Sequence, residues 1–194
     1  MILPGTDLGS WNAARIVRNM FPLLVVLSII VLWAGITLER AEDLLRTYVV
    51  LAVIVPTMID MGGNLGAILS SRLTTRFHLG MSALDPRDRI LWANVGAIIA
   101  LAVTIFTALA LGAYVLGFVL GFGTDVSLGA LLAISLISGM SVAVIAIVFS
   151  FGAAFASYRL GIDPDDTTIP IVTNVVDVFG MVIFIGVSMF VLGF

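Results

Sequence analysis

Two carboxylates, Asp60 and Asp177, stand in the middle of long apolar runs. Counted along a helix at 1.5 Å per residue, Asp60 lies roughly 18 to 21 Å from the nearest flanking arginines. Asp177 lies roughly 14 Å beyond Thr168, where its own apolar run begins. An ionisable side chain at such a position is costly, so a function is the default hypothesis for both residues. The chemistry open to the pair is cation binding, proton relay or a carboxylate dyad that shares one proton.

Small and oxygen-bearing residues accompany each carboxylate at helical spacing. Residues three or four positions apart share one face of a helix. In the later run, this face holds Pro170, Thr173, Asn174, Asp177 and Gly180. In the earlier run, it holds Asp60, Gly63, Asn64, Ala67 and Ser71. Each helix therefore presents one narrow stripe of the kind that a pore lining or a tight helix contact requires.

The stretch from Pro56 to Gly66 is the most irregular part of any apolar run, with one proline and three glycines. Pro56 removes a backbone donor, and carbonyls freed in this way can serve as ion ligands. Small residues also allow two helices to pack closely within a membrane. An ion path and close packing are both open interpretations of this stretch.

The available ligand types narrow the choice of ion. The chain has no Cys and a single His, so it offers no thiolate or multi-histidine metal site. Carboxylate, amide and hydroxyl oxygens suit a hard cation, and Mg2+ keeps several waters while it touches one or two carboxylates. We therefore predict a path for a divalent cation, with Mg2+ as the transported ion. Its candidate ligands are Asp177, Asn64, Asp60, Thr173, Asn174 and Gly63.

A second interpretation makes the chain an enzyme. Two midplane carboxylates on separate helices, Asp60 and Asp177, are also the minimum requirement of an intramembrane aspartyl protease. Neither residue lies in the Gly-x-Gly-Asp setting typical of that class. We therefore favour a transporter or channel over an enzyme.

The composition is that of a membrane protein. Of 194 residues, 61% are hydrophobic and 11% are charged, and the mean hydropathy is +1.21. A soluble domain is about half apolar and about a quarter charged. All nine positive charges are Arg and the net charge is -3, which argues against nucleic-acid binding.

Five apolar runs are long enough to cross a bilayer as helices. They cover residues 19–38, 45–69, 90–121, 128–156 and 168–194. We predict an all-α integral membrane protein with an N-terminal interfacial segment, residues 1–18, and one five-helix transmembrane domain, residues 19–194. Polar connections are expected elsewhere, including a loop from Thr74 to Arg89.

The arginines indicate the orientation, because positively charged segments stay on the cytoplasmic side. Seven of the nine lie before the first run, between the second and third, or between the fourth and fifth. The opposite side has only Arg40 and Arg46. We expect a multi-pass protein of the cell membrane with its N-terminus inside and its C-terminus outside.

Two motifs carry a family resemblance. In the first, Gly63-Asn64-Leu65 is followed by Ser71-Arg72-Leu73-Thr74-Thr75 and His78. The second runs from Asp163-Pro164 through Pro170 to Asp177. With the order and number of apolar runs, these motifs make the chain resemble the membrane domain of the MgtE magnesium channels and, more closely, one half of their eukaryotic solute-carrier relatives.

The resemblance implies a homodimer with the ion path between or beside the fifth helices. It matches Asp177 to the carboxylate that holds a hydrated Mg2+ in the pore, and it places Asn64 in the Gly-Asn motif beside that ion. Asp60 has no counterpart in the family pattern. We expect the two copies to be parallel in the bilayer, because the arginine bias acts equally on both.

Overall fold

The computed structural model describes residues 13–80, 87–121 and 125–194, and these form six α-helices. In chain order they are α1 (Ala13–Arg40), α2 (Glu42–Thr47), α3 (Val49–His78), α4 (Arg89–Leu120), α5 (Leu128–Arg159) and α6 (Pro164–Leu192). All except α2 are long and apolar enough to cross a membrane. The predicted all-α fold with five spans is therefore confirmed.

Several predicted boundaries differ from the observed ones. The helix α3 continues to His78, so the loop predicted from Thr74 begins too early. Thr74 and Thr75 donate their hydroxyl hydrogens to backbone carbonyls one turn earlier, so their polar groups have partners within the helix. The helix α6 begins at Pro164 instead of Thr168, because proline is favoured in the first turn of a helix.

The N-terminal part also differs from its prediction. Residues 13–18 belong to α1, whereas the rest of the predicted interfacial segment, residues 1–12, lies outside the described part of the chain. The short α2 occupies the connection expected between the first two spans, with Glu42 paired to Arg46.

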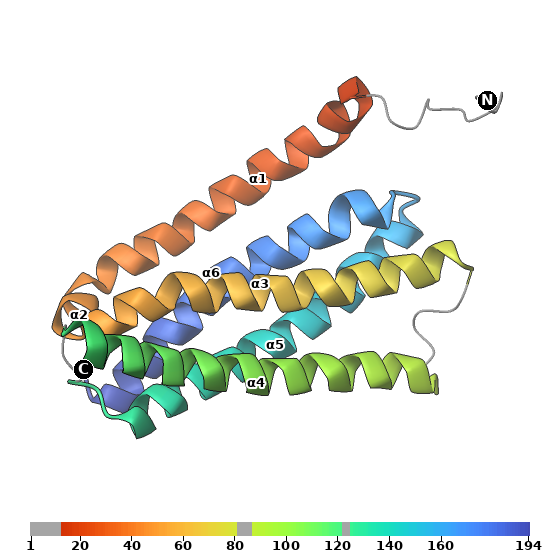
Figure 1. Ribbon diagram of the computed structural model, residues 1–194. Coiled ribbons are helices and arrows are strands. Elements are labelled where there is room, and N and C mark those ends of the chain that lie inside the picture. The colour runs from red at the N-terminus through yellow and green to blue at the C-terminus, as the bar shows by residue number, and fades with distance from the viewer. Residues whose placement is uncertain (1–12, 81–86, 122–124) are drawn as a thin grey trace, which may run out of the picture.

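The helix α6 packs against α5, α3 and α1, and α3 also packs against α4 and α5 (Figure 1). Glycines allow the close approach of these helices. A Cβ atom at Gly66 would lie 2.5 Å from Cγ1 of Val172, and one at Gly139 would overlap the ring of Phe106. The small-residue packing expected for such membrane helices is thus present in α3 and α5.

Two polar contacts join α3 to α4 near one end of the bundle. Arg72 donates to Oδ1 of Asn94 over 2.8 Å, and Arg76 pairs with Asp88. Asp88 also caps α4 by accepting the backbone N–H of Ile90 over 2.8 Å. At the same end, the hydroxyls of Ser157 and Thr167 lie 2.7 Å apart across the connection from α5 to α6.

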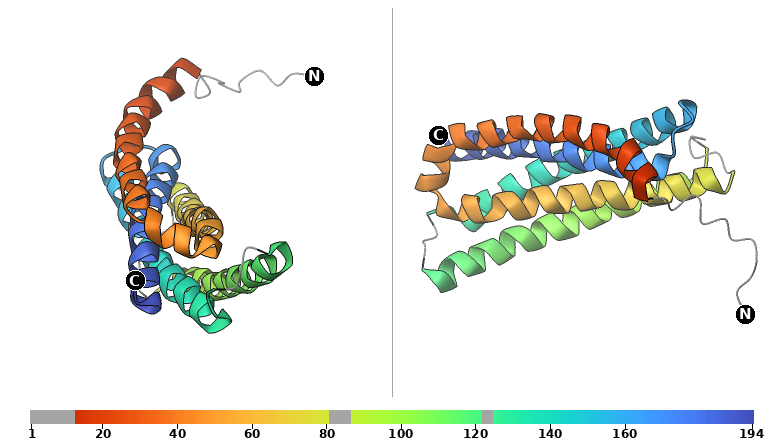
Figure 2. Two further views of the ribbon diagram at one scale, coloured as in Figure 1. Left: turned by 90° about the vertical axis from the view of Figure 1, so that its left-hand side faces the viewer. Right: turned by 90° about the horizontal axis from the view of Figure 1, so that it is seen from above.

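The start of α1, the end of α3 and the connection from α5 to α6 lie at one end of the bundle, as Figure 1 and Figure 2 show. The C-terminus, α2 and the start of α5 lie at the other end. The helix α1 diverges from α3 toward its own N-terminal end (Figure 1). This divergence separates α1 from α3 beside the middle of α6.

Candidate functional site

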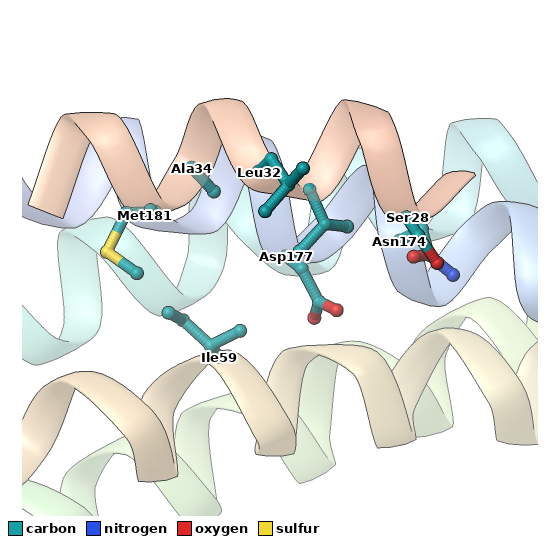
Figure 3. A pocket seen from close by; sticks show the side chains of 9 residues that line it. Ser28, Leu32, Ala34, Ile59, Asn174, Asp177 and Met181 are labelled. Carbon is teal, nitrogen blue, oxygen red and sulfur yellow. The ribbon is translucent and has the colours of Figure 1, made fainter. Parts of the chain in front are cut away.

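A cavity of about 510 Å³ lies between α1, α3 and α6. Most of its lining is apolar, and its polar groups come from α1 and α6. The lining residues are Ser28, Val31, Leu32, Ala34, Gly35, Ile59, Asn174, Asp177 and Met181. Figure 3 shows the carboxylate of Asp177 pointing from α6 toward α3, where Ile59 lies.

Asp177 is the charged residue of this cavity. It lies 11 residues after the start and 15 before the end of the span that runs from Asp166 to Leu192. Its side chain is partly buried and makes no hydrogen bond or ion pair with any residue that the structure describes. A carboxylate at this depth without a protein partner calls for water or a cation beside it.

The expected neighbours Gly63 and Thr173 lie on the contact between α3 and α6. A Cβ atom at Gly63 would lie 3.9 Å from Oδ1 of Asp177 and 3.8 Å from Cγ2 of Thr173. The backbone of α3 therefore comes close to Asp177, because Gly63 has no side chain. The helix is continuous through Pro56 and its glycines, which fits close packing more directly than an unwound segment.

Three polar side chains beside Asp177 each donate a hydrogen to their own helix. The bonds are Ser28 Oγ to Leu24 O at 2.8 Å, Thr173 Oγ1 to Ile169 O at 3.0 Å, and Asn174 Nδ2 to Pro170 O at 2.7 Å. Because the donated hydrogen points to the backbone, each oxygen keeps lone pairs for another partner. The few polar groups around Asp177 thus offer oxygens that can accept hydrogen bonds.

The remaining two candidates, Asp60 and Asn64, lie on an exposed face of α3 and do not line this cavity. Asn64 Nδ2 donates to Oδ2 of Asp60 over 3.1 Å, one helical turn apart. The sequence placed Asp60, Gly63 and Asn64 on one stripe. In the structure, Gly63 faces Asp177 while the other two form a separate polar pair.

The contribution of α1 to the cavity was not predicted. Five of the nine lining residues come from this helix, including the hydroxyl of Ser28. Ser28 is the one hydroxyl residue within the apolar stretch 21–36, and that isolation was the available signal. Nothing local in the sequence, however, indicates which helix packs beside α6.

The donor set suits a hydrated ion better than a dehydrated one. In the described part of the chain, no three His, Cys, Asp or Glu side chains gather where they could hold a metal. Six waters at about 30 Å³ each occupy about 180 Å³, so a hexahydrated cation fits within the cavity. Asp60 bonds to Asn64 and not to Asp177, and no observation supports the protease interpretation.

The fold and this cavity define a multi-pass membrane protein with one carboxylate in a largely apolar cavity at mid-span. The sequence model of the MgtE family, described as a divalent cation transporter, matches residues 55–187, which is more than half of the chain. The chain therefore belongs to the MgtE divalent cation transporter family, as its motifs indicated. A comparison with curated proteins finds no match.

Proposed function

We propose that this protein carries Mg2+ across the membrane along a path lined by α3 and α6 around Asp177. Divalent cation transport is the function of the family. The observation that carries the finer proposal is the carboxylate of Asp177, which faces a cavity at mid-span without a protein partner among the described residues. A hydrated divalent cation would balance its charge while keeping most of its waters.

The geometry of the oxygens supports the following ligand roles. Asp177 supplies the charge, while Asn174 and Thr173 supply neutral oxygens on the same helix. Gly63 keeps the backbone of α3 close to the ion without filling the space beside Asp177. Asn64 and Asp60 contribute polar groups on the exposed face of α3. Outer-sphere contact with waters of the ion requires acceptors, and these side chains provide them.

The exposed face of α3 supports a second proposal, a parallel homodimer. Asp60 and Asn64 lie at the depth of a membrane span yet are exposed in the single chain. Polar groups at this depth are tolerated where protein or a water-filled cavity covers them. A second copy in the same orientation would cover this face. The arginine distribution favours cytoplasmic N-termini in both copies.

The test is Mg2+ flux into sealed vesicles that contain only this protein, followed with a trapped Mg2+-sensitive dye. We expect flux with the unchanged chain and its loss in Asp177→Asn, which keeps the size and one oxygen but removes the charge. Asp125→Asn, an exposed carboxylate before α5, is the matched control and should transport normally. Equal flux in Asp177→Asn and the unchanged chain would refute the proposed path.

Repeating the measurement with an imposed Na+ or H+ gradient separates two forms of transport. Flux driven by the Mg2+ gradient alone indicates a channel. Flux that depends on the second gradient indicates a coupled transporter.

A further inference from the structure

The bond between Asn64 and Asp60 differs from the other polar bonds of the site. Ser28, Thr173 and Asn174 each donate to a backbone carbonyl of their own helix. Asn64 instead donates to a side chain, the carboxylate oxygen Oδ2 of Asp60, over 3.1 Å. Both partners are exposed, and they lie on the same face of α3, four residues apart.

This bond determines which end of the Asn64 amide points outward. An ionised carboxylate only accepts hydrogen bonds, whereas an amide has a donor end and an acceptor end. If the amide of Asn64 turned over, its oxygen would face Oδ2 of Asp60, and two acceptors would repel each other. Asp60 therefore holds Nδ2 toward itself and leaves Oδ1 of Asn64 available on the exposed face of α3.

The orientation matters for a hydrated cation. Waters bound to a cation turn their oxygens inward and their hydrogens outward, so the wall around them must accept hydrogen bonds. An outward amide nitrogen would oppose these waters, whereas an outward amide oxygen would accept from one of them. Around Asp177, three side chains each donate a hydrogen to a backbone carbonyl, which leaves their oxygens able to accept from such waters.

We infer that Asp60 is a positioning residue of the cation path: it holds the Asn64 amide with its oxygen outward on the exposed face of α3, where the proposed path would bring a hydrated ion beside this helix. This inference rests on the proposed function and refines it, because it assigns Asp60 an effect exerted through Asn64 instead of separate contact with the ion. Groups that orient metal ligands typically change metal affinity by about 10 to 100-fold when they are removed.

A double-mutant cycle tests the dependence on Asn64. The variants are Asp60→Ala, Asn64→Ala and the two combined, with Asp125→Ala as the control. Two quantities are measured. The first is Mg2+ flux into vesicles, and the second is the Mg2+ concentration at which the rise in melting temperature reaches half of its maximum. We expect Asp60→Ala to weaken Mg2+ binding about tenfold. The double variant should be no weaker than Asn64→Ala, because Asp60 has no amide left to orient.

A conservative variant keeps the test decisive if alanine disturbs folding. Asp60→Asn retains an oxygen that can accept from Asn64, so it should lose less affinity than Asp60→Ala. The same cycle can be built from Asp60→Asn and Asn64→Ala. In either cycle, a double variant whose loss equals the product of the single losses would show that Asp60 acts independently and would overturn the inference.

An unchanged Mg2+ affinity in Asp60→Ala would overturn it as well. Asp177→Asn, measured in the same assay, separates this inference from the proposed function. One outcome is that Asp177→Asn abolishes flux while the affinity loss of the double variant equals the product of the two single losses. In that case the transport path stands and only the positioning role of Asp60 fails. If the unchanged chain shows neither flux nor protection by Mg2+, both proposals fail.

Discussion

Gly63 on α3 lies opposite Asp177 on α6, and a Cβ atom placed at Gly63 would lie 3.9 Å from the carboxylate oxygen Oδ1. This is an ordinary van der Waals distance, so a methyl group fits there without displacing the backbone. The space beside the carboxylate is therefore preserved by the absence of a side chain. The neighbouring glycine one turn along, Gly66, has a different role, because a Cβ atom there would lie 2.5 Å from Val172.

The first prediction separates these two glycines. Gly63→Ala should leave the thermal stability close to that of the unchanged chain but reduce Mg2+ flux, because its methyl group would occupy part of the space beside Asp177. Gly63→Val should reduce flux more. Gly66→Ala should instead destabilise the fold by about 1 to 3 kcal/mol, the usual cost of overpacking. Unfolding in detergent and flux in vesicles, measured on all three variants, check the contrast; a flux-neutral Gly63→Val would place the ion elsewhere.

The second prediction concerns orientation. The chain has no Cys, so a single introduced cysteine can be labelled selectively. Leu79→Cys, at the exposed end of α3, should react with a membrane-impermeant reagent only from the cytoplasmic side. Asp125→Cys, at the opposite end of the bundle, should react only from outside. Labelling of either cysteine from both sides would contradict a parallel pair of chains.

The third prediction uses the contact between Arg76 and Asp88. The hydrogen bond from Arg76, followed by that from the backbone N–H of Ile90, lowers the pKa of Asp88 below its usual 3.8. A group whose pKa is lowered in the folded state stabilises that state above the unfolded pKa. Its contribution is lost as the pH falls through the folded value. The contact should therefore persist throughout the neutral and mildly acidic range.

Asp88→Asn isolates this contact, because Asn still caps α4 but carries no charge for Arg76. We expect a lower melting temperature than that of the unchanged chain at pH 7 and at pH 5, with the difference shrinking as the pH falls below about 3.8. Asp125→Asn provides the comparison for loss of one exposed carboxylate. A difference of constant size down to strongly acidic pH would mean that the contact with Arg76 does not account for the stabilisation.

Hydropathy alone was enough to predict the five spans, because each helix must present about 20 apolar residues to lipid. Spacing by three and four residues correctly placed Asn174 and Asp177 on one face of α6. These are local properties of single helices. The prediction for α3 was less complete. Gly63 and Asn64 are adjacent in the sequence, yet Gly63 faces Asp177 whereas Asn64 bonds to Asp60 on the exposed face of the helix.

The wall formed by α1 could not be predicted in this way. Ser28 reaches the cavity because α1 packs on α6 and diverges from α3, and that arrangement depends on side chains of three helices together. The end of α3 was also misplaced, because the tertiary contacts of Arg72 and Arg76 with residues on the other side of the loop support its last turns. Contacts between elements, and not residue types, decided both cases.

The last prediction is that Mg2+ stabilises the folded protein through Asp177. A ligand that binds only the folded state stabilises it by RT ln(1 + [L]/Kd), which is about 2.7 kcal/mol at 100 times Kd. Asp177 supplies the negative charge of the cavity, so Asp177→Asn should remove most of this stabilisation while the melting temperature without Mg2+ stays similar or rises. The melting temperature would rise because an unpaired carboxylate at mid-span destabilises the folded protein, and the substitution removes it. Melting curves over a Mg2+ series, with Asp125→Asn as the control and Na+ at matched ionic strength, provide the measurement. Equal protection of Asp177→Asn and the unchanged chain would place the bound cation away from this carboxylate.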